Sequence, residues 1–266
     1  MNISKPDGYA LITGATGGLG KAFVRLLASE GYPLILTGRS EEKLKNLKQE
    51  VNLKYPNLDV KIYAMDLTKI EERQAFFNDL RGSKMAMLVN VAGVDTQKAV
   101  TTYSQEKIAM QCRVNLESAI SMCKEAVLNK AQHLDIINIS SLSGLYPMPY
   151  FAIYSATKSA LTYFSIAFRE EVKHKGVHIT AVTPAGIPTR EDIKRQIQGQ
   201  GLWGKLTSKS ADFIALKSLR AVRKNKRKLV PGFWNRLMCK ATALLPLSWK
   251  LKFIANRWSK ISKDAF

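Results

Sequence analysis

Short runs of apolar residues alternate along the chain with segments whose apolar residues recur every three or four positions. The short runs predict buried strands, and the segments with helical spacing predict helices. The predicted strands span residues 9–13, 33–37, 60–65, 85–91, 135–139 and 178–183. The predicted helices span residues 19–31, 41–55, 70–80, 105–129 and 154–173.

Strands that are apolar throughout and separated by helices predict a parallel sheet that is covered on both faces. The expected fold class is therefore α/β, with a doubly wound dinucleotide-binding (Rossmann) sheet and ligands bound outside the carboxyl ends of the strands. We expect one domain over residues 1–232 and a C-terminal helical extension over residues 233–266.

A glycine-rich turn, TGATGGLG over residues 13–20, follows the first predicted strand and opens the first predicted helix. Gly14 permits a tight turn, Gly18 allows the backbone to approach a ligand, and Gly20 lets the helix pack on the strand. Free backbone N–H groups and the helix dipole then favour a phosphate. Glycine also serves ordinary turns, but the position after the first strand favours a pyrophosphate site.

The end of the second predicted strand bears on the choice of cofactor. An acid there would bind the adenosine ribose hydroxyls of NAD, whereas an arginine would pair with the 2′-phosphate of NADP. The sequence reads Leu-Thr-Gly-Arg39-Ser, with Lys43 one turn later and no acid before Glu41. The arginine fork suits a phosphate, so we predict NADP(H). The alternative is a solvated surface arginine.

Four polar residues form a candidate catalytic group. Tyr154 and Lys158 are four residues apart and share one face of a predicted helix. A tyrosine with a pKa near ~10 is a poor acid at neutral pH, and a neighbouring ammonium lowers that pKa. Ser141 follows the fifth predicted strand, where its hydroxyl suits a substrate oxygen. Asn115 is a poor helix former inside a predicted helix, which indicates another role.

With these motifs in this order, residues 8–232 resemble the short-chain dehydrogenase/reductase family. The motifs are Thr13 to Gly20, Asp66-Leu67, Asn90-Val-Ala-Gly93, Asn115, Ser141, Tyr154-Ser-Ala-Thr-Lys158 and Pro184-Ala-Gly-Ile-Pro-Thr189. The resemblance implies an oxidoreductase that moves a hydride between a nicotinamide and a carbonyl or alcohol. Val91, where the family usually has Asn, and Ala185, where it usually has Gly, are departures that remove no proton-transfer group.

The resemblance also implies individual roles. Tyr154 would exchange the proton, Lys158 would bind the nicotinamide ribose, Ser141 would polarise the carbonyl, and Asn115 would hold a water linked to Lys158. Asp66 would contact the adenine, Asn90 the adenosine ribose region and Thr189 the nicotinamide amide. The full set expected to bind the cofactor is Gly14, Thr16, Gly17, Gly18, Leu19, Gly20, Arg39, Asp66, Leu67, Asn90, Ala92, Gly93, Tyr154, Lys158, Pro184, Ile187 and Thr189.

The formal net charge of +20 is concentrated near the C-terminus, where residues 220–266 carry 13 Lys or Arg and one acid, Asp264. The same segment has an apolar stripe through Phe233, Leu237, Ala241 and Leu244, and a second one from Leu247 to Ile261. Such a pattern is typical of a helix in an anionic membrane interface. Packing on the protein's own core, or on a second subunit, explains the stripe equally well.

Residues 189–207 are polar, are punctuated by glycines and contain Trp203. In the family this stretch is a substrate lid, and an ordinary surface loop is the alternative. Trp203 and the tail suit a hydrophobic substrate such as a 3-oxoacyl chain, a steroid or bile-acid ketone, or another lipid-like ketone. A nucleotide-binding regulatory protein or a membrane adaptor that keeps the fold without turnover is the alternative function.

The remaining expectations concern partners and location. The chain has no signal-like start and no apolar stretch of about 18 residues, and its cysteine count is odd. We therefore expect a cytoplasmic protein, and the basic tail leaves open a peripheral location on the inner face of a membrane.

The cysteines lack metal-like spacing and the three histidines form no cluster in sequence, so no metal is expected. Nucleic acid is not expected either. The family implies a homo-oligomer, a dimer or tetramer, through the helices predicted over residues 105–129 and 154–173.

Overall fold

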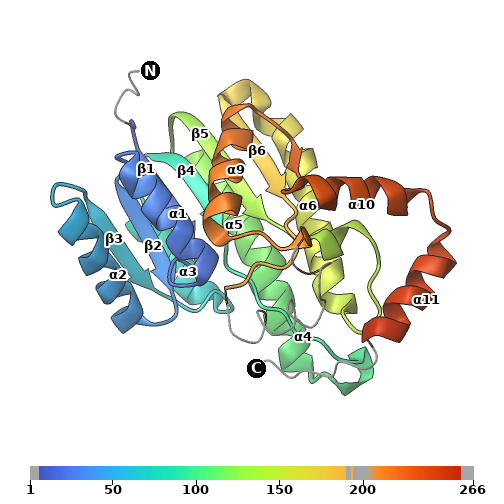
Figure 1. Cartoon of the computed structure of the whole chain (residues 1–266). Coiled ribbons are helices and arrows are strands. Elements are labelled where there is room, and N and C mark those ends of the chain that lie inside the picture. The colour runs from blue at the N-terminus through green and yellow to red at the C-terminus, as the bar shows by residue number, and fades with distance from the viewer. Residues whose placement is uncertain (1–5, 190–192, 194–203, 205, 259–266) are drawn as a thin grey trace.

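The computed structural model describes residues 6–189, 193, 204 and 206–258. Within these residues, seven parallel strands form one sheet in the order β3-β2-β1-β4-β5-β6-β7 (Figure 1). The strands are β1 (Tyr9–Thr13), β2 (Leu34–Gly38), β3 (Val60–Ala64), β4 (Met85–Asn90), β5 (Lys130–Ile139), β6 (Val177–Val182) and β7 (Lys228–Leu229). The strand order reverses between β1 and β4, which places a ligand crevice at their carboxyl ends.

Helices cover both faces of the sheet, as the unbroken apolar strands require. One face packs against α1 (Gly18–Ser29), α2 (Glu41–Lys54) and α9 (Ala211–Arg223). The other face packs against α3 (Ile70–Asp79), α5 (Ser118–Leu128) and α6 (Ala152–Val172). The predicted α/β doubly wound fold is confirmed.

The single helix predicted over residues 105–129 is instead interrupted. It consists of α4 (Gln105–Cys112), one π-helical turn (Arg113–Glu117) and α5. In the π-turn the Ser118 N–H donates to the Arg113 carbonyl, five residues back. Such turns are frequent at functional sites, and this one contains the candidate Asn115.

Besides short 3-10 turns, one helix and one strand among the described residues were not predicted. Helix α9 is capped by Ser210, whose hydroxyl accepts from the Phe213 N–H, and it buries Ile214, Leu219 and Val222. Strand β7 closes the edge of the sheet beside β6.

The C-terminal extension forms two helices, α10 (Phe233–Ala243) and α11 (Leu247–Trp258), with Pro246 just before the second. Figure 1 shows both at the side of the molecule remote from β3, meeting at a bend between them. Among the residues described, none of the helices is both long enough and apolar enough to traverse a bilayer.

Candidate active site

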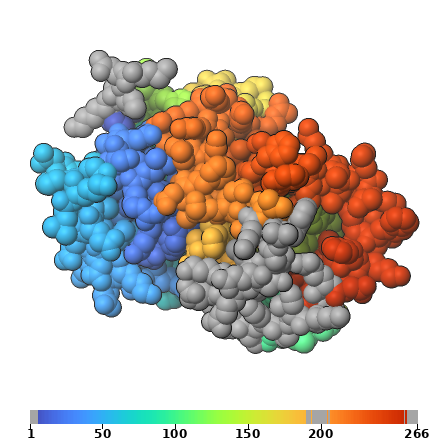
Figure 2. Space-filling model, viewed as in Figure 1, coloured from blue at the N-terminus to red at the C-terminus, as the bar shows by residue number. Residues whose placement is uncertain are grey.

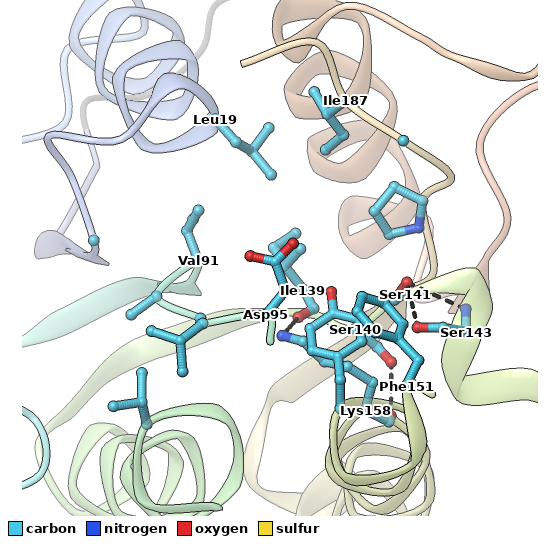
Figure 3. Close-up of a pocket in the computed structure, with 18 of the residues that line it drawn as sticks. Leu19, Val91, Asp95, Ile139, Ser140, Ser141, Ser143, Phe151, Lys158 and Ile187 are labelled. Atoms are coloured by element: carbon cyan, nitrogen blue, oxygen red, sulfur yellow. Dashed lines mark hydrogen bonds between the residues drawn. The ribbon is translucent and has the colours of Figure 1, made fainter. Parts of the chain in front are cut away.

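A cavity of about 1800 Å³ lies at the carboxyl ends of the strands. It is large enough for a dinucleotide together with a substrate, because pockets for single small ligands usually measure about 300–1,000 Å³. The predicted site residues that line it are Gly14, Thr16, Gly17, Gly18, Leu19, Gly20, Arg39, Asp66, Leu67, Ala92, Gly93, Ser141, Tyr154, Lys158, Pro184, Ile187 and Thr189. Leu19, from the start of α1, and Ile187, from the loop after β6, both line it (Figure 3).

The glycine-rich turn forms an anion cradle at the start of α1. Gly14 has a φ of 63°, which favours glycine, and a Cβ on Gly20 would lie 2.2 Å from the Gly14 carbonyl oxygen. Gly17 caps α1 without a side-chain hydrogen bond, and the first turn holds no acid. The first backbone N–H groups and the positive end of the helix dipole are therefore available to a phosphate.

Arg39 and Asp66 lie at the end of the cavity formed by β2 and β3. Arg39 is exposed and makes no hydrogen bond or ion pair with any residue that the structure describes. Asp66 accepts hydrogen bonds from the Thr68 N–H (2.9 Å) and the Thr68 hydroxyl (2.8 Å). Burial raises the pKa of Asp66, but these hydrogen bonds and the charges of Lys69 and Arg39 outweigh it and hold the pKa below its ordinary value.

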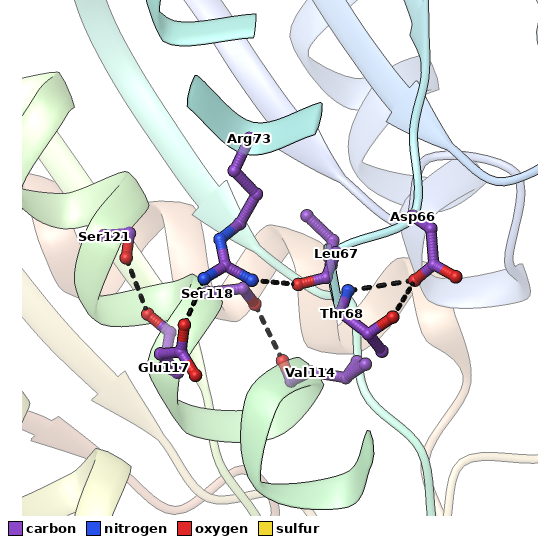
Figure 4. Close-up of polar contacts among 8 residues, drawn as sticks. All are labelled: Asp66, Leu67, Thr68, Arg73, Val114, Glu117, Ser118 and Ser121. Carbon is purple, nitrogen blue, oxygen red and sulfur yellow. Dashed lines mark hydrogen bonds and ion pairs between the residues drawn. The ribbon is translucent and has the colours of Figure 1, made fainter. Parts of the chain in front are cut away.

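A buried arginine ties this end of the cavity to the π-turn. Arg73, only 3% exposed, donates to the Leu67 carbonyl and forms an ion pair with Glu117, the last residue of the π-turn (Figure 4). One side chain thus links the Asp66–Thr68 loop to the segment that carries Asn115. Sequence reasoning missed it, because Glu117 lies 44 residues further along the chain.

Lys158 lies beside Tyr154 on α6, and both line the cavity. The Lys158 Nζ donates to the Ile139 carbonyl (2.9 Å) and lies 5.8 Å from the centre of the Tyr154 ring (Figure 3). The side chain is buried. Burial lowers the pKa of Lys158 to about 8, against the charge of Asp95, which raises it. An ammonium so placed stabilises a phenolate on Tyr154.

Ser141 and Ser140 follow β5 and have different roles. Ser141 faces the cavity, and its hydroxyl accepts from both the N–H (3.2 Å) and the hydroxyl (2.8 Å) of Ser143. The Ser140 hydroxyl is buried and donates to the Lys158 carbonyl (2.7 Å). A Cβ on Gly144 would come within 2.7 Å of that same Lys158 backbone. The loop from Ser140 to Gly144 is therefore packed directly against the backbone of α6.

Asn115 does not line the cavity. It is buried, and its amide accepts from the Val94 N–H (2.8 Å) and donates to the Val94 carbonyl (2.9 Å). Its Oδ1 and the Lys158 Nζ both lie within 3.3 Å of the point where a Cβ on Gly93 would sit. Because Gly93 has no side chain, Asn115 Oδ1 and Lys158 Nζ can both lie close to its Cα.

The expectation that Asn90 binds the adenosine ribose is not supported. Its side chain is buried outside the cavity and donates to Asn138 Oδ1 (2.8 Å). Asn138 in turn donates to the Ser165 hydroxyl (2.9 Å), so Asn90 joins β4 to β5 and α6. Because side chains alternate along a strand, Asn90 shares the face of Leu88, which packs under α5 and α6.

The expectation that the histidines form no cluster is wrong for two of the three. His133 and His178 approach to 4.4 Å between ring centres, and both contact Asp135 Oδ1, at 2.9 and 3.3 Å. The register of β5 and β6 pairs Asp135 with His178, which the sequence does not display. Burial, followed by the charge of His133, lowers the pKa of His178. The cluster lies toward the amino ends of these strands, away from Ser141.

The two departures from the family motifs leave the site intact. Val91 and Ala185 both line the cavity, and the N–H groups of Val91 and Ala92 donate to the Thr13 hydroxyl, which holds the ends of β1 and β4 together. The predicted lid, residues 189–207, lies mostly outside the described residues.

The C-terminal helices complete the cavity with an apolar wall, which sequence reasoning did not assign to the site. Leu237 and Met238 of α10 and Ile254 and Trp258 of α11 line it. The Trp258 ring stacks on Phe151 at 5.8 Å, and Phe151 contacts the Tyr154 ring at 4.7 Å. The extension is thus positioned over the candidate catalytic tyrosine.

Asp95 is a second site residue that sequence reasoning missed, although it follows the Asn90–Gly93 motif by two positions. Its carboxylate points into the cavity (Figure 3), and its charge raises the pKa of Lys158. Asp95→Asn should therefore lower the Lys158 pKa further.

The expected result is a shift in the pH dependence. The initial rate of any turnover that needs the Lys158 ammonium, measured at subsaturating substrate, should fall as pH rises through about 8, where Lys158 loses its charge. In Asp95→Asn the fall should begin at lower pH. Glu106→Gln removes a different carboxylate of the cavity wall and should leave the profile unmoved. Identical profiles for Asp95→Asn and the parent chain would contradict the coupling.

Residues 8–198 match the family model described as short chain dehydrogenase. The chain belongs to the short-chain dehydrogenase/reductase family, whose members use a nicotinamide cofactor.

Among individual proteins, the chain is similar to the very-long-chain 3-oxoacyl-CoA reductase of Bos taurus, with 32% identity over 203 residues, covering 70% of this chain and 62% of the relative. The very-long-chain 3-oxoacyl-CoA reductase-A of Danio rerio is 30% identical, and the match covers 68% of this chain and 59% of that relative. The matched region thus spans less than two thirds of these relatives. A solved 7β-hydroxysteroid dehydrogenase shares the fold, with a TM-score of 0.85 and 22% identity, covering 96% of this chain and 100% of that one.

Proposed function

We propose that the protein is an NADP(H)-dependent oxidoreductase that transfers a hydride between the nicotinamide and a carbonyl or alcohol of a hydrophobic substrate. The observation that carries the proposal is the buried Lys158 ammonium one helical turn after Tyr154, on the wall of a cavity that joins the glycine cradle to an apolar enclosure. The four candidate catalytic residues are Asn115, Ser141, Tyr154 and Lys158.

The residues of the cavity fit a nicotinamide dinucleotide. The uncapped start of α1 suits the pyrophosphate, and Arg39, without a partner among the described residues, suits a 2′-phosphate. No acid occupies the end of β2, where NAD-binding chains use one. Solved relatives of the same fold include a short-chain dehydrogenase from Sphingobium yanoikuyae in complex with NADPH, at 23% identity and a TM-score of 0.73 over 89% of this chain and 94% of that one.

NADPH would supply the hydride, and the side chains of the chain would handle the proton. Tyr154 donates its phenolic proton to the substrate oxygen during reduction and accepts it in the reverse direction. Lys158 stabilises the resulting phenolate, and Ser141, oriented by Ser143, donates a hydrogen bond to the same substrate oxygen. Asn115 and the π-turn hold the Val94 backbone beside Lys158.

A lipid-like carbonyl compound is the proposed substrate class, because the wall opposite the cofactor cradle is built from Leu237, Met238, Ile254 and Trp258. The relatives include very-long-chain 3-oxoacyl-CoA reductases and a hydroxysteroid dehydrogenase. Turnover should be measured as NADPH oxidation over a panel of 3-oxoacyl thioesters, steroid and bile-acid ketones, and short polar ketones. Activity confined to the polar ketones would contradict the substrate class, and no turnover with any carbonyl would contradict the reaction.

We further propose a homo-oligomer through α4, α5 and α6. The outer side of α6 presents Tyr163 at 74% exposure, next to the stacked rings of Phe164 and Phe168. An apolar helix face of this kind suits a symmetric contact with a second copy.

A further inference from the structure

The bend between α10 and α11 exposes more large apolar surface than other parts of the described chain do. Leu244 is 89% exposed, Trp249 is 69% exposed, and Leu245 and Leu247 between them are also exposed. These four residues, with Pro246, form what we call the apolar bend, residues 244–249. It projects from the side of the molecule farthest from β3 (Figures 1 and 2).

The inner sides of the two helices are already occupied. Leu251, Ile254 and Trp258 of α11 are half-buried, as are Met238 and Thr242 of α10, so the stripes predicted from the sequence are only partly used within the chain. Phe233 and Leu237 of α10 stay exposed, as do Leu244 just after it and Phe253 of α11. The extension therefore packs on its own protein along one side and presents a second apolar side outward.

The charges around the apolar bend all have one sign. Arg236, Lys240 and Lys252 are exposed on the same two helices, and no Asp or Glu occurs between Asp212 and Asp264. A symmetric contact with a second copy would bring these cations against one another without an acid from the helices to pair with them. An anionic lipid surface supplies the missing negative charge together with an apolar interior for Leu and Trp.

We propose that the apolar bend docks the protein onto an anionic bilayer, with Leu244, Leu247 and Trp249 entering the interface and the flanking Lys and Arg contacting the headgroups. Leu237 and Phe253 are both exposed and part of the cavity wall, so the cavity reaches the surface on these same helices. A lipid-like substrate would then enter from the membrane side. This last consequence rests on the proposed function, whereas the docking itself does not.

Sedimentation with vesicles tests the docking. The full chain should sediment with phosphatidylcholine vesicles that contain phosphatidylglycerol, at least about tenfold more strongly than with pure phosphatidylcholine, and the difference should shrink in high salt. No sedimentation with the anionic vesicles would overturn the proposal.

A matched pair of variants locates the contact. Leu244→Glu with Trp249→Glu should reduce binding to anionic vesicles by about tenfold or more. Leu53→Glu with Ile70→Glu changes charge by the same amount at two other exposed apolar residues, which lie outside α4, α5 and α6, and should bind almost as the parent does. The thermal unfolding midpoint and the NADPH-dependent reduction of a short water-soluble ketone should match among all three proteins, because none of the four residues lines the cavity.

Two results would reject the apolar bend as the lipid contact. One is equal vesicle binding by both double variants. The other is that the double variant Leu244→Glu/Trp249→Glu changes from dimer to monomer while its vesicle binding stays the same. In that case the apolar bend would contact a second copy of the chain rather than lipid. If the chain bound vesicles but turned over no carbonyl compound, the docking proposal would hold and only the proposed reaction would be wrong.

Discussion

Replacing Tyr154 by phenylalanine should lower kcat for carbonyl reduction by about a thousandfold, because the proton donor next to the Lys158 ammonium is removed. Binding of NADPH, followed by its fluorescence, should stay close to that of the parent chain, since the ring and Lys158 remain.

Tyr146→Phe is the matched control for this experiment. Tyr146 also lines the cavity, but burial raises its pKa, so it holds its proton at neutral pH. Its loss should change kcat little. If Tyr146→Phe abolished turnover and Tyr154→Phe did not, the two tyrosines would exchange roles and the proposed mechanism would be wrong.

Replacing Arg39 by aspartate should reverse the cofactor preference. Loss of a charge-assisted contact to the 2′-phosphate, with a carboxylate in its place, should lower kcat/KM for NADPH by about a hundredfold. The kcat/KM for NADH should hold or rise, because the carboxylate can accept from the free ribose hydroxyls.

Lys43→Asp makes the same change of charge one turn away, at a residue that does not line the cavity. It should reduce kcat/KM for NADPH only modestly. Equal losses in the two variants would indicate a general electrostatic effect of the basic surface rather than a contact by Arg39. A parent chain that prefers NADH would contradict the NADP(H) proposal directly.

The parts of the fold that local sequence determines were predictable. Apolar strands, a glycine turn before a helix and a Tyr-x-x-x-Lys pair are short patterns whose structural consequence depends on few distant residues. They predicted β1 to β6, the cradle at α1 and the placement of Tyr154 and Lys158 on one cavity wall.

The remaining features depend on how distant segments meet. The register of β5 against β6 brings His133 and His178 together, and the face of β4 decides that Asn90 points toward Asn138. The π-turn joins α4 and α5 with no non-helical residue between them, so residues 105–129 read as one helix in the sequence. Periodicity likewise revealed the stripes of α10 and α11 without revealing which of their sides covers the cavity.

The cavity described here is assembled from two separate parts of the polypeptide. Its glycine cradle and proposed proton-transfer residues come from β1 to α6 and the loop after β6, while the apolar wall comes from α10 and α11 near the other end of the sequence. Under the proposed function, different stretches of the gene therefore encode substrate selectivity and reactivity. Chimeras that exchange only the last two helices among relatives of this fold should acquire new substrates while retaining the original coenzyme.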